Sequence, residues 1–191
     1  MVKKILLLAA NPTDTSRLRL DQEVRDIANG LGRCQHRDQF ELVPQWAVRP
    51  RDMQRAMLDI NPQIVHFSGH GAAEKGLIFE DPTGQSNPIS GEALAALFGL
   101  FADRLQCVLL NGCYSEYQAQ AIARCIPHVI GMARAIGDRA AIEFAVGFYD
   151  ALGAGRSIPF AYQLGCAALQ MAGIPEHLTP VLLSQGELTP T

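Results

Sequence analysis

Short, uninterrupted apolar runs recur along the chain, and most are followed by a segment whose apolar residues return every three or four positions. Residues 5–10 are all apolar, as in a parallel strand covered on both faces. Residues 18–31 show helical spacing instead, ending near two glycines. This alternation predicts an α/β fold, with a mostly parallel sheet of about six strands and helices on both faces. The predicted strands are residues 5–10, 40–48, 64–67, 107–110, 128–132 and 180–184.

Capping residues and the same periodicity predict the remaining helices. Ser90 is a suitable N-cap for one helix, and Asp138 is a suitable N-cap for a long apolar helix that reaches Leu152. Between the third strand and the Ser90 helix, residues 77–80 and 88–89 flank a Pro/Gly turn and predict a small hairpin. Further helices are predicted over residues 51–60, 115–125 and 157–172.

Two of the predicted strands end in a turn of small residues, and each turn carries a reactive side chain. The third strand runs into Ser-Gly-His70-Gly71, and the fourth runs into Asn-Gly-Cys113. Open α/β sheets place catalytic groups at this carboxyl edge. A helix that starts after Cys113 would stabilise a thiolate and supply unpaired N–H groups. We therefore expect His70 as general base, Cys113 as nucleophile, and an oxyanion hole at Gly71 and Cys113.

Other histidines and cysteines have less support for a catalytic role. His66 lies inside the third strand, where a histidine is more often a packed core residue, so it is the weaker candidate for the base. His66 and His70 have the spacing of some metal sites, but that spacing joins two rings on one face only in a helix, so no metal is expected. Cys107, Cys125 and Cys166 lie in apolar stretches, as buried structural cysteines do.

Composition limits the remaining kinds of function. A chain of 191 residues fits one domain, residues 1–191, and a net charge of −3 without a basic block makes nucleic acid an unexpected partner. Five scattered cysteines argue against a disulfide framework and fit a reducing compartment. The apolar start is too short for a signal peptide, and no stretch is long enough to cross a membrane. We expect a cytoplasmic protein without membrane contact or cofactor.

Several segments, taken in order, resemble one known family. They are residues 8–12, 17–23, 65–71, 109–115 and 129–132, the last followed by the apolar helix over 141–152. This set is similar to the CHAT domain, a bacterial branch of the caspase-like cysteine peptidases, over nearly the whole chain. The resemblance implies the caspase–hemoglobinase fold, a His70–Cys113 dyad, and endopeptidase activity on protein substrates.

Substrate specificity depends on residues around the dyad. Related metacaspases that cut after Lys or Arg carry an aspartate two residues before the cysteine, whereas this chain has Asn111, so one acidic wall of the S1 pocket is missing. We expect substrate contacts at the strand ends, at Asn111 and Met132. Arg17 and Arg19, in the loop after the first strand, could each hold an acidic P1 side chain. Alternatively, both arginines are solvated residues at a helix start.

Two functions from different classes remain. The first is a cysteine endopeptidase in a bacterial defence or regulated-proteolysis pathway. The alternative is a noncatalytic caspase-like binding or scaffold module, which is disfavoured because both His70 and Cys113 are present. A nucleotide-binding domain is disfavoured too, since no Gly-rich phosphate loop follows a strand.

The segment that follows His70 is a candidate gate. Residues 72–87 are rich in Gly, Pro and polar residues, which predicts a mobile loop with few apolar contacts. We expect the isolated protein to be weakly active until a substrate or an activating protein partner docks.

Overall fold

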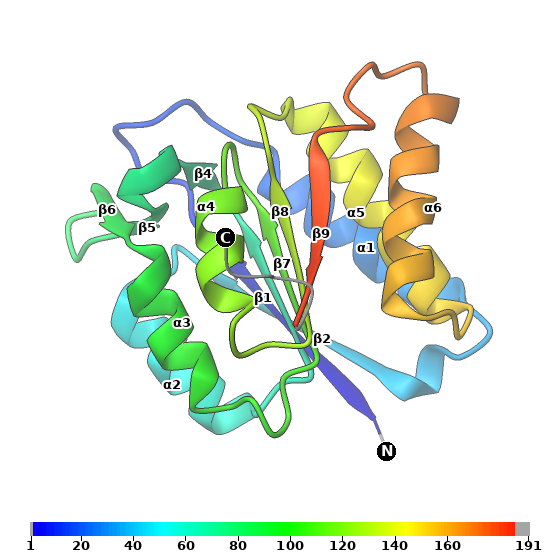
Figure 1. Cartoon of the computed structure of the whole chain (residues 1–191), viewed down its shortest axis with the longest axis horizontal. Helices are drawn as coiled ribbons and strands as arrows, with labels where there is room; N and C mark the ends of the chain where they lie inside the picture. Colours follow the sequence, from blue (N-terminus) through cyan, green and yellow to red (C-terminus); the bar gives the residue numbers. More distant parts are fainter. Residues whose placement is uncertain (1, 186–191) are drawn as a thin grey trace.

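The computed structural model describes residues 2–185, in which a six-stranded sheet lies between two layers of helices (Figure 1). Strands β1, β2, β3, β7 and β8 pair in parallel, and the edge strand β9 pairs antiparallel with β8. The predicted mostly parallel six-stranded sheet is confirmed. In spatial order the strands are β2 (Phe40–Trp46), β1 (Lys3–Ala9), β3 (Ile64–Ser68), β7 (Cys107–Asn111), β8 (His128–Met132) and β9 (Pro180–Ser184).

The helices divide evenly between the two faces of the sheet. One face carries α1 (Leu20–Arg33), α5 (Asp138–Gly153) and α6 (Ile158–Met171), and the other carries α2 (Pro50–Ile60), α3 (Gly91–Gly99) and α4 (Glu116–Ile122) (Figure 1). Ser90 caps α3 as predicted, since its Oγ accepts the Ala93 N–H at 3.3 Å. Asp138 is not the cap of α5: Gly137 occupies that position, and the Asp138 carboxylate binds Arg19 instead.

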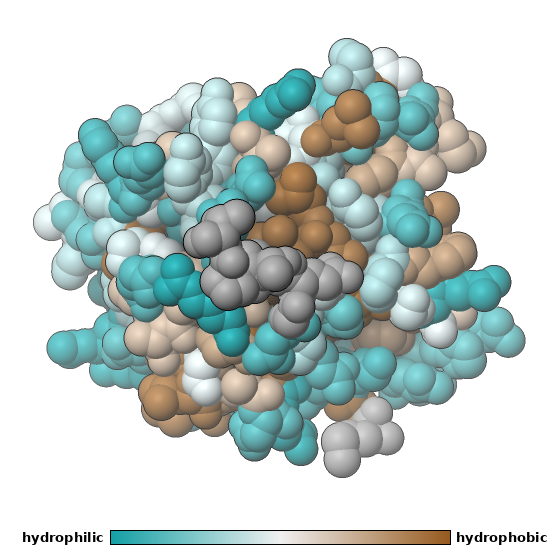
Figure 2. Space-filling view, in the orientation of Figure 1, coloured by the Kyte–Doolittle hydropathy of each residue, from teal (hydrophilic) through white to brown (hydrophobic). Residues whose placement is uncertain are grey.

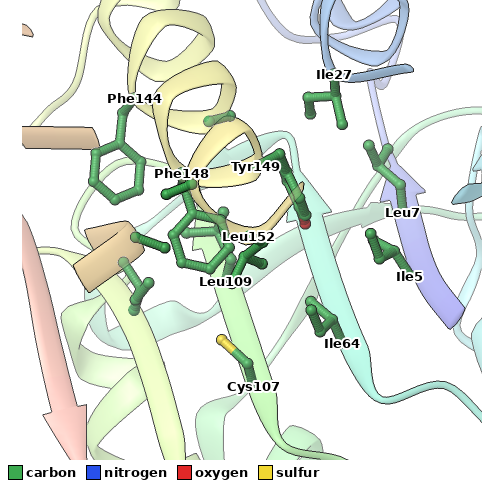
Figure 3. Close-up of a cluster of buried hydrophobic side chains, with 14 of the residues drawn as sticks. Ile5, Leu7, Ile27, Ile64, Cys107, Leu109, Phe144, Phe148, Tyr149 and Leu152 are labelled. Carbon is green, nitrogen blue, oxygen red and sulfur yellow. The ribbon is translucent and has the colours of Figure 1, made fainter. Parts of the chain in front are cut away.

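The side chains of each central strand alternate between two separate cores, which explains why its apolar run is continuous. Ile5 and Leu7 of β1 pack under α1 and α5, whereas the alternate residues Leu6 and Leu8 face α2 and the opposite layer. Figure 3 shows the first of these cores, in which Tyr149 of α5 points toward the side of Ile5 and Leu7, whereas Phe144 and Phe148 lie farther from β1. Burial on both faces fixes the register of the strands, because a slip of one residue would exchange the two sets.

A second, three-stranded antiparallel sheet follows β3 directly. It consists of β4 (His70–Gly71), β5 (Leu77–Glu80) and β6 (Ser86–Ile89), which confirms the predicted hairpin. The expectation of a loop with few apolar contacts over residues 72–87 is wrong. Leu77 and Phe79 are buried in the core beneath α3, and the Phe79 ring lies 5.0 Å from that of Phe67. The polar residues that suggested mobility belong to short turns between these anchors.

The surface mixes polar and apolar side chains. On the face drawn in Figure 2, hydrophobic residues form small groups between polar ones, and one group lies near the centre, where β9 runs in Figure 1. Among residues 2–185, no helix is both long and apolar enough to cross a membrane.

The close crossing of α5 and α6 gives a first test of the fold. A Cβ added to Gly165 would lie 2.7 Å from the Phe144 ring and 2.9 Å from its carbonyl oxygen, whereas a Cβ on Gly32 of α1 would meet nothing within 4 Å. Both Gly→Ala changes gain about 1 kcal/mol of helix propensity. Overpacking should cost Gly165→Ala about 1–3 kcal/mol. In urea unfolding we expect the free energy of unfolding of Gly165→Ala to be lower than that of Gly32→Ala by about 1–3 kcal/mol. Equal free energies of unfolding would contradict the packing described.

Candidate active site

The two predicted turns leave the sheet side by side. β3 and β7 are neighbours, and Ser68 pairs with Asn111 in the last rung of their ladder. The Gly69 N–H donates to the Asn111 carbonyl at 3.3 Å, which ties the turns together just beyond that rung. His70 and Cys113 therefore line one small cavity of about 30 Å³. The structure thus brings together the two residues that the sequence singled out.

A main-chain carbonyl orients the His70 ring. Nε2 of His70 lies 2.7 Å from the Ser16 carbonyl oxygen, in the loop between β1 and α1. Because a carbonyl can only accept a hydrogen bond, Nε2 carries a proton and Nδ1 is left as the basic nitrogen of the neutral ring. A base held by a third group is the usual arrangement in nucleophile–base pairs.

The Cys113 sulfur faces the loop that follows β8. Sγ accepts the Ile136 N–H at 3.4 Å and lies 3.6 Å from the Ile136 carbonyl oxygen. The helix expected to start at residue 115 begins instead at Glu116 and has only seven residues. Its N-terminus therefore contributes less at the sulfur than the sequence predicted, and the Ile136 backbone contacts the thiol through both its N–H and its carbonyl oxygen.

The turn after Cys113 is conformationally strained and well anchored. Tyr114 has a φ of 55°, in the left-handed region that non-glycine residues rarely adopt. Its N–H donates to the Arg134 carbonyl at 3.1 Å. The buried Ser115 hydroxyl donates to Leu110 O at 2.8 Å and accepts the Met132 N–H at 2.9 Å. These bonds to neighbouring strands hold a turn that costs on the order of 1–3 kcal/mol of backbone strain.

The expected oxyanion hole lies where two main-chain segments touch. A Cβ on Gly71 would sit 2.1 Å from the Cys113 carbonyl oxygen and 3.2 Å from its nitrogen, so only glycine permits this approach. The Cys113 N–H has no hydrogen-bond acceptor among residues 2–185. The role of Gly71 and Cys113 in stabilising an oxyanion stays a prediction.

A buried polar cluster lies beneath the dyad, and it accounts for His66. The His66 side chain is fully buried, with Nε2 3.2 Å from Glu23 Oε1 and Nδ1 3.2 Å from the Tyr149 hydroxyl. Burial raises the pKa of Tyr149 well above its ordinary range, so the hydroxyl keeps its proton. His66 is occupied by these two partners, and His70 remains the candidate base.

Glu23, the centre of this cluster, was not singled out by the sequence. Its carboxylate, 2% exposed, accepts hydrogen bonds from Ser68 Oγ and, at 2.6 Å, from Asn111 Nδ2. Burial by itself would raise the pKa of Glu23, but the hydrogen bond and charge of His66, with the bonds from Ser68 and Asn111, outweigh it and hold the pKa below its ordinary value. The carboxylate is therefore ionised at neutral pH. A signal was present, since Glu23 follows Leu20 by three residues and lies on the apolar face of α1.

The residues predicted to contact substrate are placed very differently from one another. Met132 is fully buried in the core with α5, so its side chain cannot meet a substrate, and that expectation is corrected. Asn111 lines the cavity. Its Nδ2 donates hydrogen bonds to Glu23 and to the Ala141 carbonyl, whereas its Oδ1 has no hydrogen-bond partner among the described residues. Arg19 pairs with Asp138 at 2.6 Å, whereas the exposed Arg17 lines an adjoining depression of about 350 Å³.

A family model for the CHAT domain matches residues 2–171 of the chain. A Roc-COR-CHAT protease from an unknown prokaryotic organism is 28% identical over 180 residues, which is 91% of this chain and 17% of the relative. A probable protease from Gillisia limnaea is 27% identical over 153 residues, 79% of this chain and 27% of that protein. The chain thus spans only about a sixth to a quarter of the curated relatives it matches.

Two solved structures share the fold. A secreted C11 cysteine protease from Bacteroides thetaiotaomicron, in complex with an irreversible peptide inhibitor, matches with a TM-score of 0.72 and 14% identity over 98% of this chain and 68% of its own. The Arg-specific cysteine proteinase gingipain R matches with a TM-score of 0.68 and 14% identity over 97% of this chain and 46% of its own. The architecture is therefore that of the caspase-like cysteine peptidases, as the sequence predicted.

Thiol reactivity provides a test of the site. Burial raises the pKa of Cys107 to about 12 and raises the pKa values of Cys125 and Cys166, so these three thiols should react slowly. We expect limiting iodoacetamide at pH 7 to modify Cys113 first, as read by peptide mass spectrometry. Cys34, also partly exposed, is the internal control. Preferential labelling of Cys34, or none at Cys113 in the folded protein, would contradict the assignment.

Proposed function

Because this chain belongs to the CHAT domain family, we propose that it is a cysteine endopeptidase with Cys113 as the nucleophile and His70 as the general base. The observation that carries the proposal is the shared cavity, which is lined both by a half-buried thiol beside the Ile136 amide and by a histidine oriented by the Ser16 carbonyl. Protein-chain substrates are inferred from the family and from the protease names of the relatives.

The proposed reaction proceeds in two halves. Nδ1 of His70 takes the proton of Cys113, and the thiolate attacks the scissile carbonyl carbon to give an oxyanion near the N–H groups of Gly71 and Cys113. The C–N bond then breaks as His70 protonates the leaving amine, which leaves a thioester on Cys113. Water, deprotonated by His70, attacks this thioester and releases the carboxylic acid and the free thiol. General acid–base catalysis of this kind contributes about 10²–10⁴-fold in rate.

The setting of the activity is part of the proposal. We propose that it acts in a bacterial defence or regulated-proteolysis pathway, and five free cysteines support a reducing, cytoplasmic location. A net charge of −3 argues against nucleic acid as a partner. An activating protein partner would have to act on something other than the order of residues 72–87, since Leu77 and Phe79 already anchor that segment.

The dyad is tested by cleavage-site profiling of an unbiased peptide library. We expect Cys113→Ala and His70→Ala each to lower cleavage at least about 10³-fold, because each removes a group that reacts with the substrate. Cys34→Ala, which removes a thiol far from the cavity, should cleave like the wild type. Cleavage that persists in Cys113→Ala would refute the proposal, and a wild type that cuts nothing would favour the noncatalytic binding module.

Arg17 is the proposed specificity residue of the loop after β1. Leu18 and Leu20 line both the dyad cavity and the depression that holds Arg17, so a substrate residue could reach the guanidinium from the scissile bond. We expect Arg17→Ala to lose about tenfold in preference for acidic over neutral side chains near the cut, about 1.4 kcal/mol. Arg124→Ala, which disturbs an exposed pair with Glu92 away from this depression, is the matched control. An unchanged profile in Arg17→Ala would mean that this arginine is simply solvated.

A further inference from the structure

We propose that Glu23 is a positioning residue for the dyad: its buried carboxylate clamps the ends of β3 and β7 and so fixes the spacing of His70 and Cys113. The inference rests on the proposed function, since it assigns Glu23 a part in that reaction. The ladder of β3 and β7 does not itself include the dyad, because His70 lies in β4 and Cys113 in a turn, both beyond the last rung.

The carboxylate joins equivalent points of the two strands. Ser68 stands two residues before His70, and Asn111 stands two residues before Cys113. These two residues face each other in the register of β3 and β7, and Glu23 accepts a hydrogen bond from each, with one oxygen for each strand. A two-oxygen acceptor across the final rung limits how far the strand ends can splay or twist apart.

The same cluster also reaches the third segment of the site. Asn111 Nδ2 donates a second bond to the Ala141 carbonyl at 3.0 Å, and His66 connects Glu23 to Tyr149, so the cluster holds α5 at two levels. The loop that enters α5 carries Ile136, whose N–H faces the Cys113 sulfur. Glu23 is thereby linked to β7, which precedes the thiol, and to α5, which follows the Ile136 loop.

Packing does not explain a carboxylate at this position. The neighbours of Glu23 on the buried face of α1 are Leu20, Val24 and Ile27, and an apolar residue there would avoid burying a charge. Glu23 is also a poor candidate for direct substrate binding. Although it lines the cavity, Oε2 is engaged by Ser68 and Oε1 by Asn111 and His66.

The test is the pH profile of iodoacetamide labelling at Cys113 in the full chain, expressed as a ratio to Cys34 in the same molecule. In the wild type we expect Cys113 to react about tenfold faster than Cys34 at pH 6, because a histidine partner sustains the thiolate, and His70→Ala should abolish that excess. Glu23→Gln should lower the Cys113-to-Cys34 labelling ratio about tenfold. It should also raise the pH at which labelling of Cys113 reaches half of its maximal rate. Ser68→Ala should change the labelling ratio and this pH in the same directions, although it retains the charge of Glu23.

The controls separate positioning from charge and from stability. Asp21→Asn makes the same change of charge on an exposed residue of α1 and should leave the ratio unchanged. Loss of a negative charge alone would ease thiol ionisation and move the Glu23→Gln profile to lower pH, the opposite direction. Lower stability alone would lower the melting temperature without altering the ratio measured in folded protein.

The outcomes are distinguishable. If His70→Ala leaves the wild-type ratio intact, the dyad is refuted, and the role of Glu23 falls with it. If His70→Ala changes the ratio but Ser68→Ala and Glu23→Gln do not, only the role of Glu23 is refuted. Should Glu23→Gln fail to fold, Ser68→Ala decides alone, since it removes a single hydroxyl from the clamp.

Discussion

The parallel register of β3 and β7 is the constraint on which the site depends. Because Ser68 lies opposite Asn111, the two strands end at the same height, and the turns that follow reach one cavity. That register follows from the cores on both faces of the sheet, where alternate residues of each strand belong to different clusters. Ordinary hydrophobic burial thus brings two reactive side chains together from turns 43 positions apart.

The features that depend on the pattern of apolar and polar side chains could be predicted well from the sequence. Apolar runs gave six strands, and residues 128–132 form β8 with the expected bounds. A small-residue turn after a buried strand identified His70 and Cys113. Two predictions were wrong because they gave side-chain pattern too little weight. In residues 72–87, the Gly and Pro content was given more weight than the apolar Leu77 and Phe79, which are buried. Met132 was expected to contact substrate because it ends a strand, although the alternation of side chains along that strand places it in the core.

Other parts of the site leave little trace in sequence. The groups that face the dyad from outside are the Ser16 carbonyl and the Ile136 amide, and any residue type could supply them. Their positions depend on loop conformation, which periodicity does not describe. Glu23 is the exception, because a charged residue on the apolar face of α1 is visible in advance. Its partners, however, come from two other elements, β3 and β7, and could be found only in the folded chain.

The candidate site draws on residues spread from Ser16 to Ile136, in the order Ser16 carbonyl, His70 ring, Cys113 thiol and Ile136 amide. During synthesis the carbonyl and the histidine emerge well before the cysteine, and the loop that contacts the sulfur emerges later still. A nascent chain that ends before residue 136 lacks that loop and the helix α5 behind it, so it has no complete constellation. The order of the chain thus delays assembly of the proposed site until most of the domain has left the ribosome.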